Sequence, residues 1–305
     1  MKRVHPKHLW RLLQGSLAAG TMAPPAILAD PAAGPEPSLE HPVSQACTAG
    51  QFASPRYAAW CAAIGEAPRT HRKQWEFCYI LEVLHQAGML APGRRGLGFG
   101  VGEEPLAAYF AARGCTVVAT DLGAAEAERA GWVDTGQHAA EKAALNGRGL
   151  CPAEAFAERV SFRVVDMNAI PPDLAGFDFT WSACSLEHVG SIAKGLAFIE
   201  NSLATLRPGG LAVHTTEFNC SSNGRTLDNA GTVLFRRRDF EGLARRLRAQ
   251  GHRLAFNFHL GDQPLDRHID VPPFSADKHL KLRLDRYLTT SFGLIVQRAE
   301  DGAGD

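Results

Sequence analysis

The alternation of strand and helix patterns from residue 94 onward is the feature that most restricts how this chain can fold. Helical spacing is clearest where Ile192, Leu196 and Ile199 recur at intervals of four and three. Such alternation predicts the α/β class, with a doubly wound, Rossmann-like and mostly parallel sheet. The five predicted strands cover residues 95–98, 116–120, 160–165, 177–182 and 211–216.

The regions around this alternating part predict the domain organisation. Prolines are concentrated between Thr21 and Pro42, which predicts an irregular extension. Residues 1–19 predict either a short basic amphipathic helix or a frayed terminus, and Arg11 and Gln14 argue against a secretory signal because they interrupt its apolar core. We expect an irregular Pro/Ala-rich extension over residues 1–53, a helical lead-in over 54–92 with helices near 57–64 and 72–88, a main domain over 93–298 and a tail over 299–305.

Charge and composition exclude several classes of protein. Lys and Arg together number 32, as do Asp and Glu, and this balance argues against a nucleic-acid partner, which attracts a basic excess. No apolar run approaches the ~18 residues that span a bilayer, so no integral membrane segment is expected. The 7 cysteines are scattered without a C-x-x-C pair. We therefore expect reduced thiols in a cytoplasmic protein, and no metal site.

A glycine-rich turn between the first predicted strand and the following helix carries the first functional signal. Gly96, Gly98, Gly100 and Gly102 alternate with larger residues, and glycine at such a turn allows close approach of a ligand to the backbone. The nicotinamide dinucleotide pattern G-x-G-x-x-G is not met, because Val101 or Glu103 stands at its third glycine. The turn therefore departs from the nicotinamide dinucleotide fingerprint, which makes a nicotinamide oxidoreductase the third alternative.

Acidic residues follow the next two predicted strands. Asp121 ends the second strand, where a carboxylate can accept hydrogen bonds from both hydroxyls of a ribose. Asp166 and Met167 end the third, where a carboxylate and a backbone amide can hold an adenine edge. A helix cap or a turn is the alternative role for each aspartate.

With these pieces in one order, the sequence resembles the class I S-adenosylmethionine-dependent methyltransferases of the small-molecule type. The resemblance covers about residues 70–298 and includes Phe177 to Ser182 and Leu206 to Leu211. It implies a seven-stranded sheet, in which two late strands at 254–258 and 288–296 form an antiparallel edge. It also implies S-adenosyl-L-methionine as cofactor, held by Gly98, Phe99, Gly100, Gly102, Asp121, Leu122, Asp166, Met167 and Ser182.

One position departs from the family pattern. An acidic residue usually stands two residues before the first motif glycine, where it helps to orient the methionine end of the cofactor, and this chain has Gly96 there. Glu103, Arg72 or Tyr79 are the alternatives for that contact.

The segment after the fourth strand carries the candidate catalytic residue. A hydroxyl acceptor must lose its proton, and the neutral imidazole of His188 suits that step; a histidine bonded to backbone at a helix start is the alternative. Cys184 is interpreted as a small buried filler. We expect methyl transfer to a small-molecule or glycan acceptor, with a hydroxyl as target; N-methylation and a noncatalytic cofactor-fold binding module are the alternatives. The oligomeric state is left open.

Overall fold

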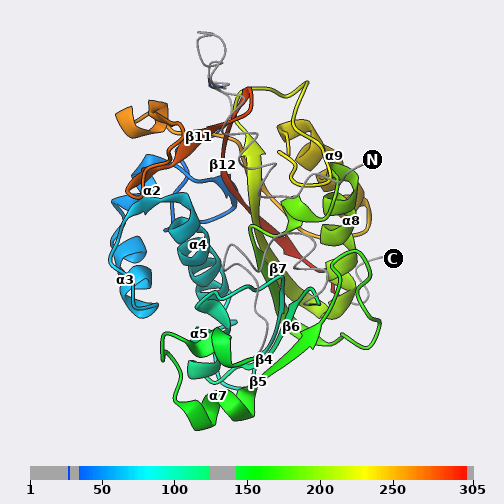
Figure 1. The fold of residues 1–305 in the computed structure, drawn as a ribbon. Coiled ribbons are helices and arrows are strands. Elements are labelled where there is room, and N and C mark those ends of the chain that lie inside the picture. The colour runs from blue at the N-terminus through cyan, green and yellow to red at the C-terminus, as the bar shows by residue number, and fades with distance from the viewer. Residues whose placement is uncertain (1–26, 28–33, 124–141, 301–305) are drawn as a thin grey trace, which may run out of the picture.

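The computed structural model describes residue 27 and residues 34–123 and 142–300. Its central sheet has the strand order β5-β4-β3-β6-β7-β12-β1-β8 (Figure 1). Neighbours from β5 to β7 pair in parallel, and β12 pairs antiparallel with β7. This is the doubly wound α/β class that the alternation predicts, but the sheet has ten strands and not the seven that the resemblance implies, because short strands extend it beyond the antiparallel edge. The strands are β3 (Arg95–Phe99), β4 (Thr116–Asp121), β5 (Val160–Val164), β6 (Phe177–Ala183), β7 (Leu206–Asn219) and β12 (Tyr287–Gln297).

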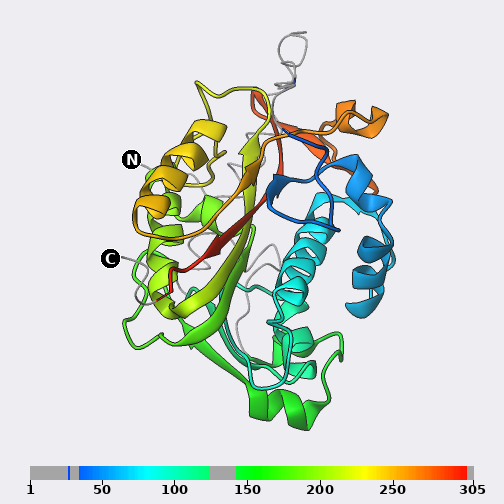
Figure 2. The same cartoon turned by 180° about the vertical axis from the view of Figure 1, so that it is seen from behind.

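Helices cover both faces of the sheet, as Figures 1 and 2 show from opposite sides. One face carries α3 (Pro55–Ala63), α4 (Arg72–Gln86), α5 (Leu106–Ala112) and α7 (Ala153–Arg159). The other carries α8 (Ile192–Ser202) and α9 (Arg237–Ala249). Burial of apolar side chains drives this layering. Helix α4 lies where a helix was predicted near residues 72–88, and buried apolar side chains form a stripe along it, in which Trp75 and Tyr79 stack with 4.9 Å between ring centroids.

The N-terminal part enters the sheet, contrary to the irregular extension expected up to residue 53. Strand β1 (Ser44–Ala46) lies between β12 and β8 (Phe256–Asn257), so the two late strands are not neighbours. A three-residue strand has no readable periodicity, and its polar Gln45 is satisfied in the core by a hydrogen bond from its Nε2 to Gln51 Oε1 at 2.8 Å. Helix α2 (Ala49–Phe52) follows directly.

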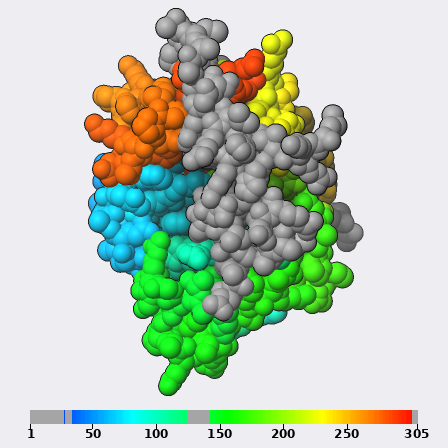
Figure 3. All heavy atoms as spheres, in the orientation of Figure 1, coloured from blue at the N-terminus to red at the C-terminus, as the bar shows by residue number. Residues whose placement is uncertain are grey.

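Short elements complete the fold. The polar segment after β8 contains η6 (Pro264–Arg267), β9 (Ile269–Asp270), β10 (Lys278–His279) and β11 (Lys281–Leu284). Strand β10 pairs with β2 (Thr70–His71) just before α4, so this segment, orange in Figure 3, lies against the lead-in helices. The remaining turns are η3 (Lys142–Asn146), η4 (Leu186–His188) and η5 (Leu203–Thr205). Within the described ranges, no helix is long and apolar enough to cross a membrane. The expectations for residues 1–19 lie outside these ranges.

Strand β7 begins earlier than expected. It starts at Leu206 and includes Pro208, Gly209 and Gly210, whereas the predicted strand begins at residue 211. The register between β6 and β7 shifts between Phe177 and Phe179, so the strand absorbs the Pro-Gly-Gly segment as an irregularity.

The aromatic side chains of β6 explain the glycines of β3. A Cβ at Gly96 would lie 2.4 Å from Cζ of Phe179, and one at Gly98 would lie 2.4 Å from Cζ2 of Trp181. Phe110 of α5 packs edge-on against both rings, at 5.2 and 4.9 Å between centroids. The acidic residue of the family pattern is therefore absent because the Phe179 ring fills its place.

Replacing Gly96 with alanine is expected to lower the free energy of unfolding by about 1–3 kcal/mol, because the added methyl group overpacks the ring of Phe179. Urea denaturation measures the change. The matched control is Gly242→Ala in α9, where the nearest atoms to a Cβ lie 3.8 Å away and alanine should stabilise the helix by about 0.5–1 kcal/mol. Equal stability of the Gly96 variant and the unmodified chain would contradict the packing argument.

Candidate active site

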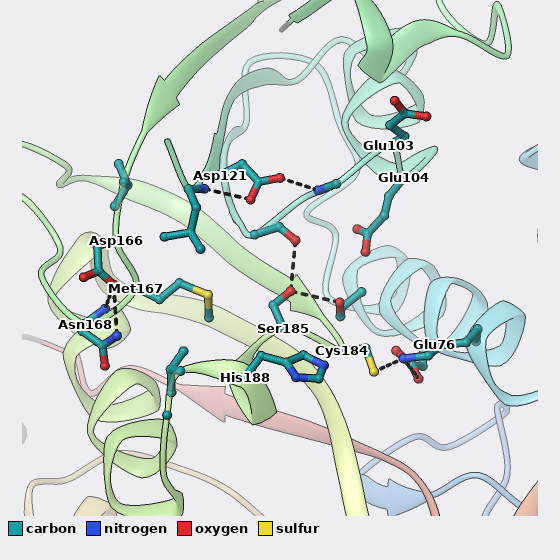
Figure 4. A pocket seen from close by; sticks show the side chains of 18 of the residues that line it. Glu76, Glu103, Glu104, Asp121, Asp166, Met167, Asn168, Cys184, Ser185 and His188 are labelled. Carbon is teal, nitrogen blue, oxygen red and sulfur yellow. Dashed lines mark hydrogen bonds and ion pairs between the residues drawn. The ribbon is translucent and has the colours of Figure 1, made fainter. Parts of the chain in front are cut away.

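A cavity of about 520 Å³ opens at the carboxyl ends of the parallel strands (Figure 4). It lies at the end of β3, where the strand order reverses. The next strand in the chain, β4, lies on one side of β3, and β6 lies on the other. Crevices at such a switch point are the usual ligand sites of open α/β sheets. The lining includes Lys73 and Glu76 of α4, Glu104, Asp121, Met167, and residues 183–185 and 188–190 after β6.

Asp121 organises the glycine turn on one side of the cavity. Its Oδ2 accepts a hydrogen bond from the backbone N–H of Gly102 at 3.0 Å, and its Oδ1 accepts one from the N–H of Leu122 at 2.8 Å. Gly100 and Gly102 have φ of +56° and +49°, which favour glycine. The structure thus brings together four predicted cofactor residues, since Gly100, Gly102, Asp121 and Leu122 all line the cavity.

The end of β5 forms the adjoining wall. The carboxylate of Asp166 is exposed and accepts hydrogen bonds from the backbone N–H and Nδ2 of Asn168, at 2.8 and 3.0 Å. Met167 is buried and lines the cavity beside Asp166 (Figure 4). Both predicted residues therefore reach the cavity, and Asp166 also makes the turn that was its alternative role.

Three predicted cofactor residues lie away from the cavity wall. Phe99 packs edge-on against Phe198 of α8 at 5.2 Å between centroids. Ser182 hydrogen-bonds Nδ1 of His214 at 2.9 Å in the core. Gly98 accepts a hydrogen bond at its carbonyl from Oγ1 of Thr120 at 2.7 Å. None of the three lines the cavity, because side chains within a buried strand point to the helix layers.

His188, the predicted base, lines the cavity from η4 (Figure 4). Its Nδ1 donates to the carbonyl oxygen of Gly231 at 2.8 Å, so the lone pair of the neutral ring lies on Nε2. The backbone bond and the catalytic role are thus compatible, since the bond fixes the tautomer that a base needs. His214 is fully buried, and burial lowers its pKa to about 3. It cannot replace His188 at the cavity.

Cys184 has a different environment from the one expected. It is only half-buried, has a φ of +50°, and its Sγ contacts Nζ of Lys73 and the carboxylate of Glu187. Ser185 beside it donates to the carbonyl of Gly100 at 3.0 Å. A thiol so close to an ammonium group is part of a polar network and is not a core filler.

This polar network extends beneath the cavity and was missed by sequence reasoning. Glu217 of β7 pairs with Nη1 of Arg72 at 2.5 Å, and this ion pair lowers the pKa of Glu217 despite burial. Burial raises the pKa of Glu76, which accepts a hydrogen bond from Oγ1 of Thr215 at 2.8 Å. Charged residues on the buried face of α4 are the signal that could have revealed it.

Three of these groups could in principle ligate a metal. One ligand atom each of Cys184, Glu187 and Glu217 lies within 4.8 Å of the others. Lys73 already contacts the Cys184 sulfur, and Arg72 already pairs with Glu217. These two cations already balance the negative charge of the cluster. We therefore interpret it as a network of ion pairs and not as a metal site.

Comparisons with known proteins agree with this architecture. The model of one family, described as a methyltransferase domain, matches residues 97–214. No curated protein sequence matches the chain.

Solved structures show distant likenesses. A proposed sarcosine dimethylglycine methyltransferase from Galdieria sulphuraria is 14% identical over 75% of this chain and 85% of its own, with a TM-score of 0.43. A phosphoethanolamine N-methyltransferase 2 from Haemonchus contortus is 22% identical over 54% of this chain and 36% of its own, with a TM-score of 0.39. The glycopeptide N-methyltransferase MtfA is 18% identical over 48% and 60%, with a TM-score of 0.34. The chain thus spans less than two thirds of the latter two proteins.

Proposed function

We propose that the chain is a class I S-adenosylmethionine-dependent methyltransferase, with S-adenosyl-L-methionine as cofactor, and that its acceptor is a hydroxyl group of a small molecule or glycan. The methyltransferase-domain model that matches residues 97–214 supports the family assignment. One observation carries the choice of a hydroxyl: the His188 ring is held by Gly231 in the tautomer whose Nε2 can take a proton.

The cavity residues fit this cofactor. The Asp121 carboxylate ends β4 at the cavity wall, where it can accept hydrogen bonds from ribose hydroxyls while it holds the glycine turn. Val165 and Met167 offer apolar contact to a flat adenine ring, with Asp166 at its edge. The volume of about 520 Å³ lies within the roughly 300–1,000 Å³ of cofactor-sized pockets.

The residues of the chain supply alignment and proton transfer. The bound cofactor supplies an activated methyl group on sulfur. The glycine turn and Asp121 fix the orientation of the cofactor, and Ser185 ties the segment after β6 to that turn through the Gly100 carbonyl. His188 Nε2 accepts the proton of the acceptor hydroxyl as its oxygen forms the new bond. The Nδ1 bond to Gly231 keeps the ring oriented during that step.

An amine acceptor is the second candidate, and the carboxylates in the cavity favour it. Glu76 and Glu104 line the cavity, with only the ammonium of Lys73 and the guanidinium of Arg148 as basic lining partners among the described residues. A carboxylate attracts a protonated amine. An amine that arrives neutral would need no base, whereas a protonated one would first have to give up a proton before its nitrogen can accept the methyl group.

An acceptor screen with methyl-labelled cofactor tests the proposal. Matched pairs of compounds that differ only in a hydroxyl or an amine should be compared, with product identified by mass spectrometry. Label on the hydroxyl member supports the proposal, and label on only the amine members overturns it in favour of N-methylation. A protein that binds S-adenosylmethionine by calorimetry but labels neither class would indicate a noncatalytic binding module.

Replacing Asp166 with alanine is expected to raise the KM for the cofactor several-fold and to leave kcat nearly unchanged. The adenine is the same in ground and transition states, so its contacts contribute uniform binding. The rise in KM should be smaller than the rise expected on removal of a buried carboxylate, because Asp166 is exposed to solvent. Steady-state kinetics with varied cofactor measures it, and a large loss of kcat at saturating cofactor would place Asp166 near the reacting methyl instead.

A further inference from the structure

The contact that Gly96 cannot make has to come from another residue, and the three alternatives expected from the sequence are unsuitable. Tyr79 donates its hydroxyl to the carbonyl of Val43 at 2.7 Å, away from the cavity. Arg72 is paired with Glu217. Glu103 also borders the cavity, but it is exposed, and its side chain extends away from that of Glu104 in Figure 4.

Glu104 lies in the position that these three do not fill. It precedes Pro105 at the entry to α5, and its side chain points into the cavity (Figure 4). Its Oε2 is buried and has no hydrogen-bond partner among the residues that the structure describes. A buried carboxylate oxygen without a hydrogen bond destabilises the folded protein. Such an oxygen at a ligand cavity therefore indicates that its hydrogen-bond donor belongs to the ligand.

The charges around Glu104 define what that partner must be. Burial raises the pKa of Glu104 well above its ordinary range, and the carboxylates of Glu76 on α4 and Asp121 on β4 raise it further. Lys73 and Arg148 oppose this rise but leave the pKa high. A group that supplies both N–H donors and a positive charge would satisfy the orphaned oxygen and stabilise the ionised carboxylate.

We propose that Glu104 binds the α-ammonium group of the methionine part of the cofactor, and so takes the place of the acidic residue that Phe179 excludes from position 96. The inference rests on the cofactor assignment above. Asp121 marks the ribose position at the end of β4, and Glu76 with Lys73 lies on α4 at the far side. All three carboxylates line one cavity, and in the view of Figure 4 that of Glu104 lies between those of Asp121 and Glu76, on the side to which the chain that leaves the ribose would extend.

The direct test uses the product S-adenosylhomocysteine and its analogue in which hydrogen replaces the amino group. Calorimetry without acceptor should show that the unmodified chain prefers the amino form by about 10- to 150-fold, the range of a charge-assisted hydrogen bond. In Glu104→Gln this preference should fall to within a few-fold. The variant should keep the fold, because glutamine has nearly the same size and shape and Oε2 makes no hydrogen bond within the described part of the chain that the substitution could break.

The neighbouring variant Glu103→Gln serves as the matched control, since it removes one carboxylate from the same turn. Its preference for the amino form should equal that of the unmodified chain. An unchanged preference in Glu104→Gln, or a loss of preference in Glu103→Gln, overturns the inference. If S-adenosylhomocysteine does not bind the unmodified chain at all, the cofactor assignment fails first, so the two failures are distinguishable.

Proton release gives a second readout that does not depend on catalysis. Burial raises the pKa of Glu104 and so favours its protonated form in the free protein, whereas binding of an ammonium favours its ionised form. Binding of S-adenosylhomocysteine should therefore release a proton and tighten as the pH rises. Titrations in two buffers of different ionisation enthalpy measure that proton. Its persistence in Glu104→Gln would assign it to another group and contradict the inference.

Discussion

Replacing His188 with alanine is expected to lower kcat by about 10²- to 10⁴-fold with a hydroxyl acceptor, while the affinity for the cofactor changes little. The reason is geometric. The Nδ1–H bond to Gly231 leaves Nε2 as the proton acceptor of the neutral ring, and the ring lies in the cavity wall beside Cys184. Single-turnover kinetics with labelled cofactor measures the chemical step without product release.

A structural role for His188 predicts a different outcome. The variant would then lose some stability, because the Gly231 carbonyl loses its donor, but would keep most of its turnover. His252→Ala is the matched control, since His252 accepts a hydrogen bond from the N–H of Ala299 outside the cavity. If both variants keep their turnover, His188 is not the base; Glu187 is fully buried like His214 and does not line the cavity, so neither of them replaces it. Loss of turnover in only the His188 variant supports the proposal.

The fold was largely predictable because burial leaves a period in the sequence. The buried apolar side chains recur along α4 at helical spacing, and they form continuous runs in the parallel strands. Both patterns can be recognised in the sequence, so these elements could be predicted. Strand β1 leaves no such mark. It is three residues long, and its Gln45 is buried through a hydrogen bond to Gln51, which a hydrophobicity pattern cannot reveal. The order of the late strands therefore could not be read from the sequence.

The candidate site was predictable only where its residues lie at or shortly after a strand end. Asp121 is the last residue of β4 and Met167 lies three residues after the end of β5, so the sheet topology alone brings them to the cavity. Ser182 lies inside β6, and its side chain faces His214 instead. Lys73 and Cys184 are 111 positions apart, and only packing of α4 against the sheet brings them into contact. Glu104 was not recognised because it stands beside a second glutamate, Glu103, and the sequence alone does not show which of the two side chains faces the cavity.

Replacing Asp121 with alanine is expected to weaken both S-adenosylmethionine and S-adenosylhomocysteine by about 1.5–3 kcal/mol, or roughly 10- to 150-fold. The carboxylate is buried, and its charge strengthens every hydrogen bond that it accepts. Calorimetry with both ligands measures the loss. Asp173→Ala is the matched control, since that aspartate is exposed and pairs only with Arg163 among the described residues, at 2.6 Å; its loss should leave cofactor affinity unchanged.

The loss in the Asp121 variant has two sources, which a second ligand separates. Alanine removes the proposed ribose contacts, and it also frees the N–H groups of Gly102 and Leu122 that shape the turn. An S-adenosylhomocysteine analogue without ribose hydroxyls should bind the unmodified chain weakly and lose little more affinity in Asp121→Ala. If the variant weakens this analogue as strongly as the parent ligand, the two effects add and Asp121 acts only through the turn. If the penalties overlap, the carboxylate and the hydroxyls are in direct contact.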